Sequence, residues 1–186
     1  MKKTLIILGH NRTDSFCGAI AKTYAKSAKL AGSEIEMLNL GELKFDPILT
    51  DRNMKKESDI VKAQALILWA DHLVFVYPNW WGAAPALLKG FIDRTFLSDF
   101  AFEYTKKGGY RKLLTGKTAH LIMTMDAPPW YYKIVCGNAW QSIMKKNVLG
   151  FCGIKPVKIT MFGSVKQSDN NIRKQWLEKV ENLAKK

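Results

Sequence analysis

Two adjacent tryptophans stand just after an apolar run of the chain. Residues 73–77, Leu-Val-Phe-Val-Tyr, are mostly β-branched or aromatic, which predicts a strand buried on both faces. The residues that follow this run are Pro78, Asn79, Trp80, Trp81 and Gly82. Large aromatic side chains at the carboxyl end of such a strand favour a flat, partly apolar ligand, because ligands of open α/β sheets bind at that edge. Two alternatives to ligand binding would use the same residues: packing in the protein core, or a contact between subunits.

Small polar residues fill the turn after another expected strand, at residues 4–8. The turn has Gly9 alone, so it is not the Gly-x-Gly-x-x-Gly pattern of dinucleotide-binding proteins. Its polar residues are Asn11, Thr13 and Ser15. They precede a helix whose N-terminus favours a phosphate group, because its N–H groups are free and the helix dipole is positive there.

Two basic residues, His10 and Arg12, add positive charge to this turn. We expect Asp14 to face solvent or Arg12, since a carboxylate beside a phosphate is unfavourable. A simple helix cap formed by Ser15 or Asp14 would use the same geometry, so the sequence leaves both interpretations open.

Strands and helices alternate along the chain, which predicts an α/β fold with a parallel sheet and helices on both faces. Besides the two strands above, we expect strands at 33–40, 118–124 and 155–161. The expected helices are at about 16–31 with Gly32 as its stop, 58–69 with Ser58 as its cap, 85–96 with Pro85 in its first position, 138–151, and from a cap at Ser168 or Asp169 to the end.

Two further stretches read as long loops, residues 98–115 and 125–137. Both are aromatic, and the first is too long for a plain connector, which indicates a functional or interface loop. In a five-stranded sheet ordered 2-1-3-4-5, loops 9–17, 78–83 and 124–137 meet in one crevice. No internal repeat or linker divides the chain, so we expect one domain over residues 1–186.

Composition narrows the class of protein. The chain has 186 residues, of which 47% are hydrophobic, and this is typical of a globular protein with a sizeable core. We expect no transmembrane segment, because no apolar run is long enough. The cysteines, Cys17, Cys136 and Cys152, are dispersed and no export signal precedes them, which favours the reducing cytoplasm.

The net charge of +13 is strongly basic. The basic residues are spread over several expected elements and accompany no nucleic-acid motif. A solvated basic surface is therefore favoured over a specific nucleic-acid site. The histidines and cysteines form no metal-binding pattern, so we expect no metal site. His72 and His120 read as strand residues with satisfied hydrogen bonds, and Cys152 has no neighbouring histidine that would activate it.

The stretch Tyr77-Pro-Asn-Trp-Trp-Gly-Ala-Ala-Pro-Ala-Leu-Leu-Lys-Gly-Phe-Ile-Asp-Arg94 resembles the flavin loop and following helix of the flavodoxin-like NAD(P)H:quinone oxidoreductases. Gly9-His10, Ser15-Phe16 and Gly150-Phe-Cys-Gly-Ile154 also fit this family, and the resemblance covers nearly the whole chain. It implies a flavodoxin-like three-layer fold, a non-covalent flavin and a homodimer with active sites at the subunit interface.

The resemblance also implies site residues. The flavin phosphate and ribityl chain would lie against His10, Ser15, Phe16 and Cys17. One edge of the flavin ring would meet Asn79, Trp80, Trp81 and Gly82, and the other Thr124, Met125, Asp126 and Ala127, whose N–H groups could stabilise negative charge. Aromatic candidates for lining the pocket across the dimer are Phe100, Phe102, Tyr104, Trp130 and Tyr131, with plain interface packing as the alternative.

Tyr132 matches a tyrosine that family members place near the flavin ring. It is our candidate catalytic residue, either hydrogen-bonding the acceptor or serving only as an aromatic wall. The chain departs from the family pattern where relatives are Gly-rich, since it has Asp126-Ala-Pro-Pro129, and it lacks a histidine just beyond Tyr132. A tyrosine–histidine proton relay is therefore not expected. The chain is shorter than relatives that hold FAD through an extra segment, so we expect FMN, with FAD as the alternative.

The expected activity is transfer of two electrons from NAD(P)H to a quinone or similar flat acceptor by a ping-pong mechanism, with the flavin carrying the chemistry. Two other functions stay open. One is a flavodoxin-type electron carrier, although such carriers are typically acidic. The other is a flavin-binding regulatory subunit of a membrane transporter, or a nucleic-acid-associated protein, that uses the basic surface.

Overall fold

The chain folds around one parallel sheet flanked by helices. The computed structural model describes residues 1–51 and 53–185. In spatial order the sheet contains β2 (Glu34–Asn39), β1 (Lys3–Leu8), β3 (His72–Pro78), β6 (Thr118–Thr124) and β7 (Val157–Phe162). Every neighbouring pair is parallel. The expected order 2-1-3-4-5 is confirmed, with β6 and β7 as its fourth and fifth strands.

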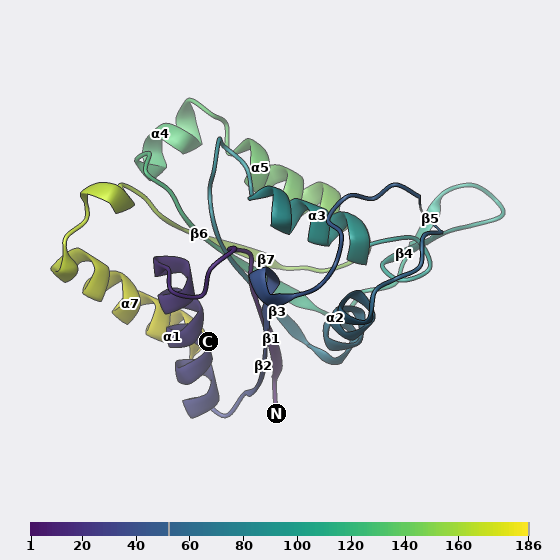
Figure 1. The fold of residues 1–186 in the computed structure, drawn as a ribbon, viewed down its shortest axis with the longest axis horizontal. Coiled ribbons are helices and arrows are strands. Elements are labelled where there is room, and N and C mark those ends of the chain that lie inside the picture. The colour runs from purple at the N-terminus through teal and green to yellow at the C-terminus, as the bar shows by residue number, and fades with distance from the viewer. Residues whose placement is uncertain (52, 186) are drawn as a thin grey trace.

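Helices cover both faces of this sheet and make three layers (Figure 1). Helices α1 (Phe16–Leu30) and α7 (Asn170–Ala184) pack together on one face. On the other face lie α2 (Ser58–Trp69), α3 (Ala86–Thr95) and a continuous helical stretch made of α5 (Ala139–Ser142), the π-helical η2 (Ile143–Leu149) and α6 (Gly150–Cys152). Alternation along β1 serves both layers, since Leu5 and Ile7 join one core cluster and Ile6 and Leu8 the other.

The central strand β3 is buried along its whole length. This explains why its sequence is a continuous apolar run rather than an alternating one. The strand continues through Pro78, one residue further than expected, because Pro78 pairs with Thr124 at the end of the ladder. Both strands therefore finish side by side at the same edge of the sheet.

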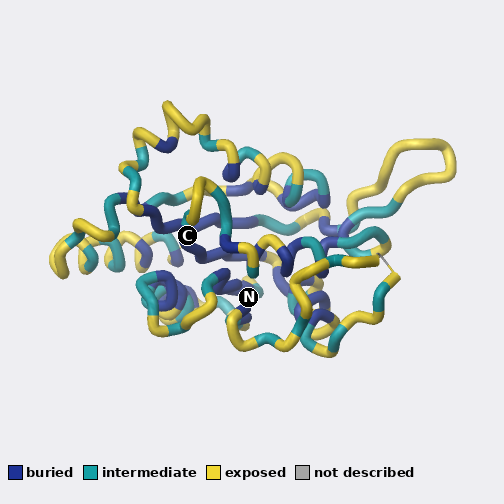
Figure 2. Tube along the Cα trace, turned by 45° about the horizontal axis from the view of Figure 1, so that its top comes forward, coloured by how far each residue is buried: buried dark blue, intermediate teal, exposed yellow. Residues whose placement is uncertain are grey.

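Two stretches expected to be loops contain regular structure. Residues 98–115 include a hairpin of β4 (Phe102–Tyr104) and β5 (Tyr110–Lys112), which projects from the body of the molecule (Figure 1). Its tip is exposed (Figure 2). The stretch 125–137 includes the helix α4 (Pro129–Ile134), which begins at a proline because the first helical position needs no N–H donor. Short 3₁₀ turns are η1 (Leu40–Glu42) and η3 (Val165–Gln167).

The helix caps differ in part from expectation. Ser15 and Asp169 cap α1 and α7 as expected, each accepting a hydrogen bond from a backbone N–H in the first turn. The prediction that Ser58 caps α2 was wrong, because Ser58 is the first residue of the helix and Glu57 occupies the cap position. The carboxylate of Glu57 instead binds the guanidinium of Arg94 at 2.6 Å. Likewise Pro85 precedes α3 as its cap rather than occupying its first position.

The Arg94–Glu57 ion pair fixes the irregular segment that leads into α2. Arg94 is 1% exposed, and it also donates to the carbonyl oxygen of Asp46. Gly90 allows Pro47 to pack closely on α3, since a Cβ there would lie 2.4 Å from the Pro47 Cβ. No helix in the described part of the chain is long and apolar enough to cross a membrane.

Candidate functional site

Three loops leave the carboxyl ends of β1, β3 and β6 and form one crevice. Two adjoining cavities occupy it, and Asn79, Trp80, Met125 and Asp126 line both. Tyr132 and all the cofactor-binding residues expected from the sequence line one cavity or the other, whereas the aromatic residues expected to line the pocket across a dimer do not. The sequence prediction therefore placed Tyr132 and the expected cofactor-binding residues together correctly, while their roles toward a ligand stay predictions.

The first cavity, of about 390 Å³, is mostly polar and lies at the N-terminus of α1. It is lined by His10, Arg12, Asp14, Ser15, Phe16, Cys17, Pro78, Asn79, Trp80, Thr124, Met125, Asp126 and Val165. The turn folds tightly against the first turn of α1, and only glycine fits at position 18, because a Cβ there would lie 1.9 Å from the carbonyl oxygen of Thr13. The Ser15 hydroxyl accepts from the Gly18 N–H at 3.1 Å.

His10 is held as a neutral donor in this cavity. Its Nδ1 accepts from the backbone N–H of Arg12 at 3.0 Å, so the ring proton is on Nε2. The ring meets the Trp80 ring edge-on at 5.5 Å. Burial, and then the charge of Arg12, lower the pKa of His10. The Arg12 guanidinium itself lies 3.9 Å from the carboxylate of Asp14, as expected, and both side chains are exposed.

Cys17 and Thr124 form the inner wall of the polar cavity. The Cys17 Sγ lies 3.2 Å from the Thr124 Oγ1, and both side chains are buried. Burial raises the pKa of Cys17 to about 12, so this cysteine is a neutral thiol. It shapes the wall and is not an activated nucleophile.

The second cavity, of about 630 Å³, is more apolar and lies beyond the tryptophans. It is lined by Asn79, Trp80, Trp81, Gly82, Met125, Asp126, Ala127, Tyr132 and Cys136. Trp80 and Ala83 exchange two backbone hydrogen bonds, of 2.9 and 3.0 Å, around the residues between them. Those residues, Trp81 and Gly82, have φ values of +53° and +77°, as in a type I′ turn. The turn leaves Trp81 fully exposed at the entrance of the cavity.

Tyr132 belongs to α4 and connects that helix to this turn by a hydrogen bond. Its hydroxyl donates to the carbonyl oxygen of Gly82 at 2.6 Å, across 50 residues of sequence. The side chain is buried, and burial raises the pKa of Tyr132, so the phenol is neutral. The hydroxyl proton is therefore already donated to this turn, residues 80–83, which we call the tryptophan turn. Next to it, the Oδ1 of Asn79 is buried without a hydrogen-bond partner among the described residues.

The loop after β6 has fewer free donors than expected. The Met125 N–H donates to the carbonyl oxygen of Phe162, and the Asp126 carboxylate accepts from the Lys166 N–H at 3.0 Å. Within the described residues, the N–H groups of Asp126 and Ala127 stay available at this end of the crevice. Asp126 and Ala127 therefore keep backbone donors for a ligand, whereas the Met125 N–H is already used.

Three lining residues were not among the expected site residues: Asp14, which was expected only to face solvent or Arg12, and Cys136 and Val165, which sequence reasoning missed. Cys136 lies just after α4, and its only signal was the proximity in sequence to Tyr132. Val165 belongs to η3, after β7, in a segment with no sequence feature typical of a site. The aromatic residues Trp130 and Tyr131 line neither cavity, and both are exposed.

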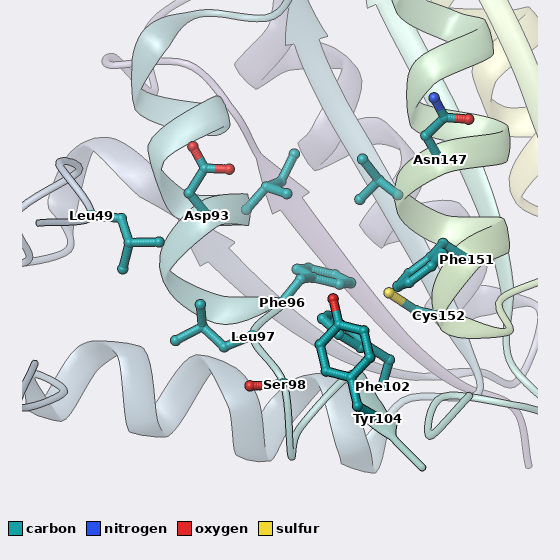
Figure 3. Close-up of a pocket in the computed structure, with 12 residues that line it drawn as sticks. Leu49, Asp93, Phe96, Leu97, Ser98, Phe102, Tyr104, Asn147, Phe151 and Cys152 are labelled. Atoms are coloured by element: carbon teal, nitrogen blue, oxygen red, sulfur yellow. The ribbon is translucent and has the colours of Figure 1, made fainter. Parts of the chain in front are cut away.

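The hairpin aromatics lie at a separate cavity of about 300 Å³. Figure 3 shows Phe96, Phe102 and Tyr104 facing Phe151 and Cys152 between α3, the hairpin and α6. The rings of Phe102 and Phe151 meet at 4.9 Å. Phe100 is partly buried against the core and does not line this cavity.

A parallel sheet of this order with a crevice at its carboxyl edge defines the flavodoxin-like class, and comparisons with known proteins agree. A family described as a flavodoxin-like fold matches residues 2–184. An uncharacterised NAD(P)H oxidoreductase of Haemophilus influenzae is 30% identical over 182 residues, which cover 94% of this chain and 90% of that protein. The chain belongs to the flavodoxin-like NAD(P)H:quinone oxidoreductase family.

Other similar proteins share most of the chain. NAD(P)H dehydrogenase [quinone] 1 of Cavia porcellus is 25% identical, over 98% of this chain and 78% of that protein. The crystal structure of Smu.1420 from Streptococcus mutans is 34% identical, covers 98% of both chains and has a TM-score of 0.84. An FMN-dependent NADH-azoreductase from Bacillus anthracis, solved with FMN, shares the fold at 22% identity and a TM-score of 0.75, over 99% of this chain and 98% of that one.

Proposed function

We propose that the protein is an FMN-dependent NAD(P)H:quinone oxidoreductase. The observation that carries this proposal is the pair of adjoining cavities, one polar at a helix N-terminus and one apolar beside a tryptophan turn. A phosphate tail suits the first and a flat redox ring the second. The names of the relatives support the same activity, since they include a quinone dehydrogenase and an FMN-dependent reductase.

The residues present fit this cofactor. The phosphate would meet the N-terminus of α1 and the Nε2–H of His10, with Arg12 at the rim. The Ser15 hydroxyl caps the helix there, accepting from the Gly18 N–H and donating to the Arg12 carbonyl oxygen. The ring would lie along Asn79 and the tryptophan turn, where the unpaired Oδ1 of Asn79 offers an acceptor. FMN is favoured over FAD because one phosphate group suits the polar cavity at the N-terminus of α1.

When bound, the flavin would supply the redox chemistry, accepting two electrons from NAD(P)H and passing them to a quinone. The chain's own residues bind and orient. The Asp126 and Ala127 N–H groups stabilise negative charge at one end of the crevice. Tyr132 holds the Trp80–Ala83 turn as a wall of the apolar cavity. Because that cavity is one continuous space, donor and acceptor would occupy it in turn, as a ping-pong mechanism requires.

We also propose a homodimer whose subunits share their active sites. Trp81 is fully exposed beside the apolar cavity, and Tyr104 is largely exposed on the hairpin, so each offers apolar surface to a partner. A second copy is the occupant we favour, with the hairpin aromatics Phe102 and Tyr104 facing the partner's crevice. A cytoplasmic location fits the three unpaired cysteines, one of them exposed.

The absorbance spectrum of the purified protein tests this function directly. We expect a yellow protein that releases FMN on denaturation and oxidises NAD(P)H when a quinone is added. Sedimentation of the same sample tests the dimer. A protein that stays colourless and does not bind added FMN would contradict the proposal. Titration with a reductant separates enzyme from carrier, since a stable one-electron form would favour the electron carrier.

A further inference from the structure

A second basic cavity lies at the opposite edge of the sheet, where β1, β3, β6 and β7 begin. Its volume is about 230 Å³. It is lined by Lys2, Tyr24, His72, Thr118, Ala119, His120, Pro156, Lys158 and Leu183. Nothing in the proposed redox activity uses this cavity, because the length of β3 separates it from the crevice by about 20 Å, at roughly 3.3 Å per residue of strand.

Two buried histidines form the inner wall of this cavity. His72 is 6% exposed, and its Nδ1 lies 2.6 Å from the Thr118 Oγ1, while its Nε2 lies 3.4 Å from the Tyr24 hydroxyl. His120 is 3% exposed, and its Nε2 lies 2.9 Å from the Thr160 Oγ1. The Tyr24 and His120 rings meet edge-on at 6.3 Å. The wall is therefore a fixed set of hydrogen-bonding groups taken from four elements of the fold.

Two lysines make the cavity electropositive. Burial, and then the charges around each ring, among them Lys2 and Lys158, lower the pKa of His72 to about 3 and of His120 to about 4. Burial and then Lys158 also lower the pKa of Lys2. The described residues that line the cavity include no carboxylate. The nearby carboxylate of Asp71 favours the charged form of Lys2, but it is already engaged by the Lys3 N–H at 2.9 Å.

We propose that this cavity binds a small oxyanion, either a phosphate group or a short carboxylate. Lys2 and Lys158 supply the positive charge, and the Tyr24 hydroxyl, whose contact with His72 is the longest of the wall at 3.4 Å, can turn to donate a hydrogen bond to the anion. Ala119, Pro156 and Leu183 form apolar walls that leave room for a few carbon atoms beside the anionic group. The anion would relieve the repulsion between the two lysines, which have no carboxylate between them in the cavity lining.

The chain contains only three histidines, so their ring signals in an NMR titration report each site separately. His72 and His120 report the basic cavity, and His10 reports the crevice. With inorganic phosphate as the probe, we expect saturable shifts of the His72 and His120 signals and a rise in the pKa of both rings. A parallel titration with propionate tells a phosphate preference from a carboxylate preference. Shifts confined to His10, or no saturation for either probe, would overturn the proposal.

Charge variants provide the second test. We expect Lys2→Ala and Lys158→Ala each to weaken binding of the preferred probe by about tenfold or more, since each removes a charged hydrogen-bond donor. Lys174→Ala is the matched control, because Lys174 is exposed on α7 and does not line the cavity. Equal affinity in all three variants would show that the histidines are merely structural. FMN binding is unaffected in every case, so failure here is distinct from failure of the proposed redox function.

Discussion

Replacing Tyr132 by phenylalanine separates two possible roles of this residue. The substitution removes the hydroxyl that donates to the Gly82 carbonyl oxygen at 2.6 Å and leaves the ring in its buried site. Gly82 is exposed, so water can satisfy the freed carbonyl. The loss is then one net hydrogen bond, about 1 kcal/mol, which lowers the population of the ordered turn roughly fivefold relative to the disordered one.

If Tyr132 only fastens the turn, FMN affinity falls by at most roughly fivefold and the rate with saturating quinone changes little. If Tyr132 instead donates a proton to the acceptor, the rate falls roughly 100- to 10,000-fold while FMN affinity is nearly unchanged. Fluorescence titration with FMN and stopped-flow reduction of a quinone measure the two quantities. We expect the first pattern, because the hydroxyl proton is already donated to Gly82.

Tyr131→Phe is the matched control for this variant. Tyr131 stands on the same helix, is exposed and lines neither cavity of the crevice. It should behave as the unmodified protein in both assays. A rate loss of more than roughly 100-fold in Tyr132→Phe alone would refute the fastening role and restore the catalytic one.

Other substitutions test the fold and the phosphate end of the crevice. Gly18→Ala should weaken FMN binding about tenfold or more, since its Cβ would lie 1.9 Å from the Thr13 carbonyl oxygen and must displace the turn; unchanged affinity with an intact circular-dichroism spectrum would contradict this. Glu57→Gln should cost about 3 kcal/mol in urea unfolding, the low end for a broken buried ion pair, because Arg94 stays buried without its counter-charge while Glu57 is only partly buried. Burial opposes the charged form of Glu57, but backbone N–H groups and Arg94 lower its pKa, so this contribution is present above the ordinary pKa of about 4.3 and is lost as pH falls below it. Burial lowers the pKa of His72 to about 3 and of His120 to about 4, whereas a histidine of the unfolded chain has a pKa of about 6.5. The unfolded chain therefore binds more protons between about pH 4 and 6.5, and the free energy of unfolding should fall as pH drops through that window. A His120→Gln variant whose stability depended on pH just as steeply would argue against this.

The sheet and its topology were predictable because their signal is local. Each long strand is an apolar run followed by a turn, and the alternation with helices leaves few arrangements of a parallel sheet. The edge position of β2 could be read from its alternating pattern, Glu34–Asn39. Burial on both faces gave β3 its continuous apolar sequence.

Short elements were missed because their stability comes from tertiary contacts. Strands β4 and β5 have three residues each, too few for a period to emerge, and Gly108 and Gly109 at their turn were the one available signal. Helix α4 lies in a stretch whose two prolines favoured a loop, although a proline at the first helical position is well tolerated. The hairpin packs Tyr110 against Phe151, 41 positions further along the chain, with the rings stacked at 4.1 Å.

The site was predictable as a set of loops but not as a set of contacts. Motif and topology together indicated that residues near Ser15, Trp80 and Asp126 converge, and they line one crevice. The hydrogen bond from Tyr132 to Gly82 depends on how α4 packs over the tryptophan turn, which no local pattern encodes. Val165 enters from beyond β7 for the same reason.

Burial favours the neutral form of three titratable residues of the crevice. It lowers the pKa of His10 and raises the pKa of Cys17 and Tyr132, so each of these groups is held in its neutral form. Formal charges lie at the rim, on Arg12, Asp14 and Asp126. A neutral interior of this kind can orient a ligand by hydrogen bonds and aromatic contact, but it offers no strong acid or base to the reacting atoms. The structure therefore favours a chain that positions and shields its redox cofactor and leaves proton exchange to the substrates and water.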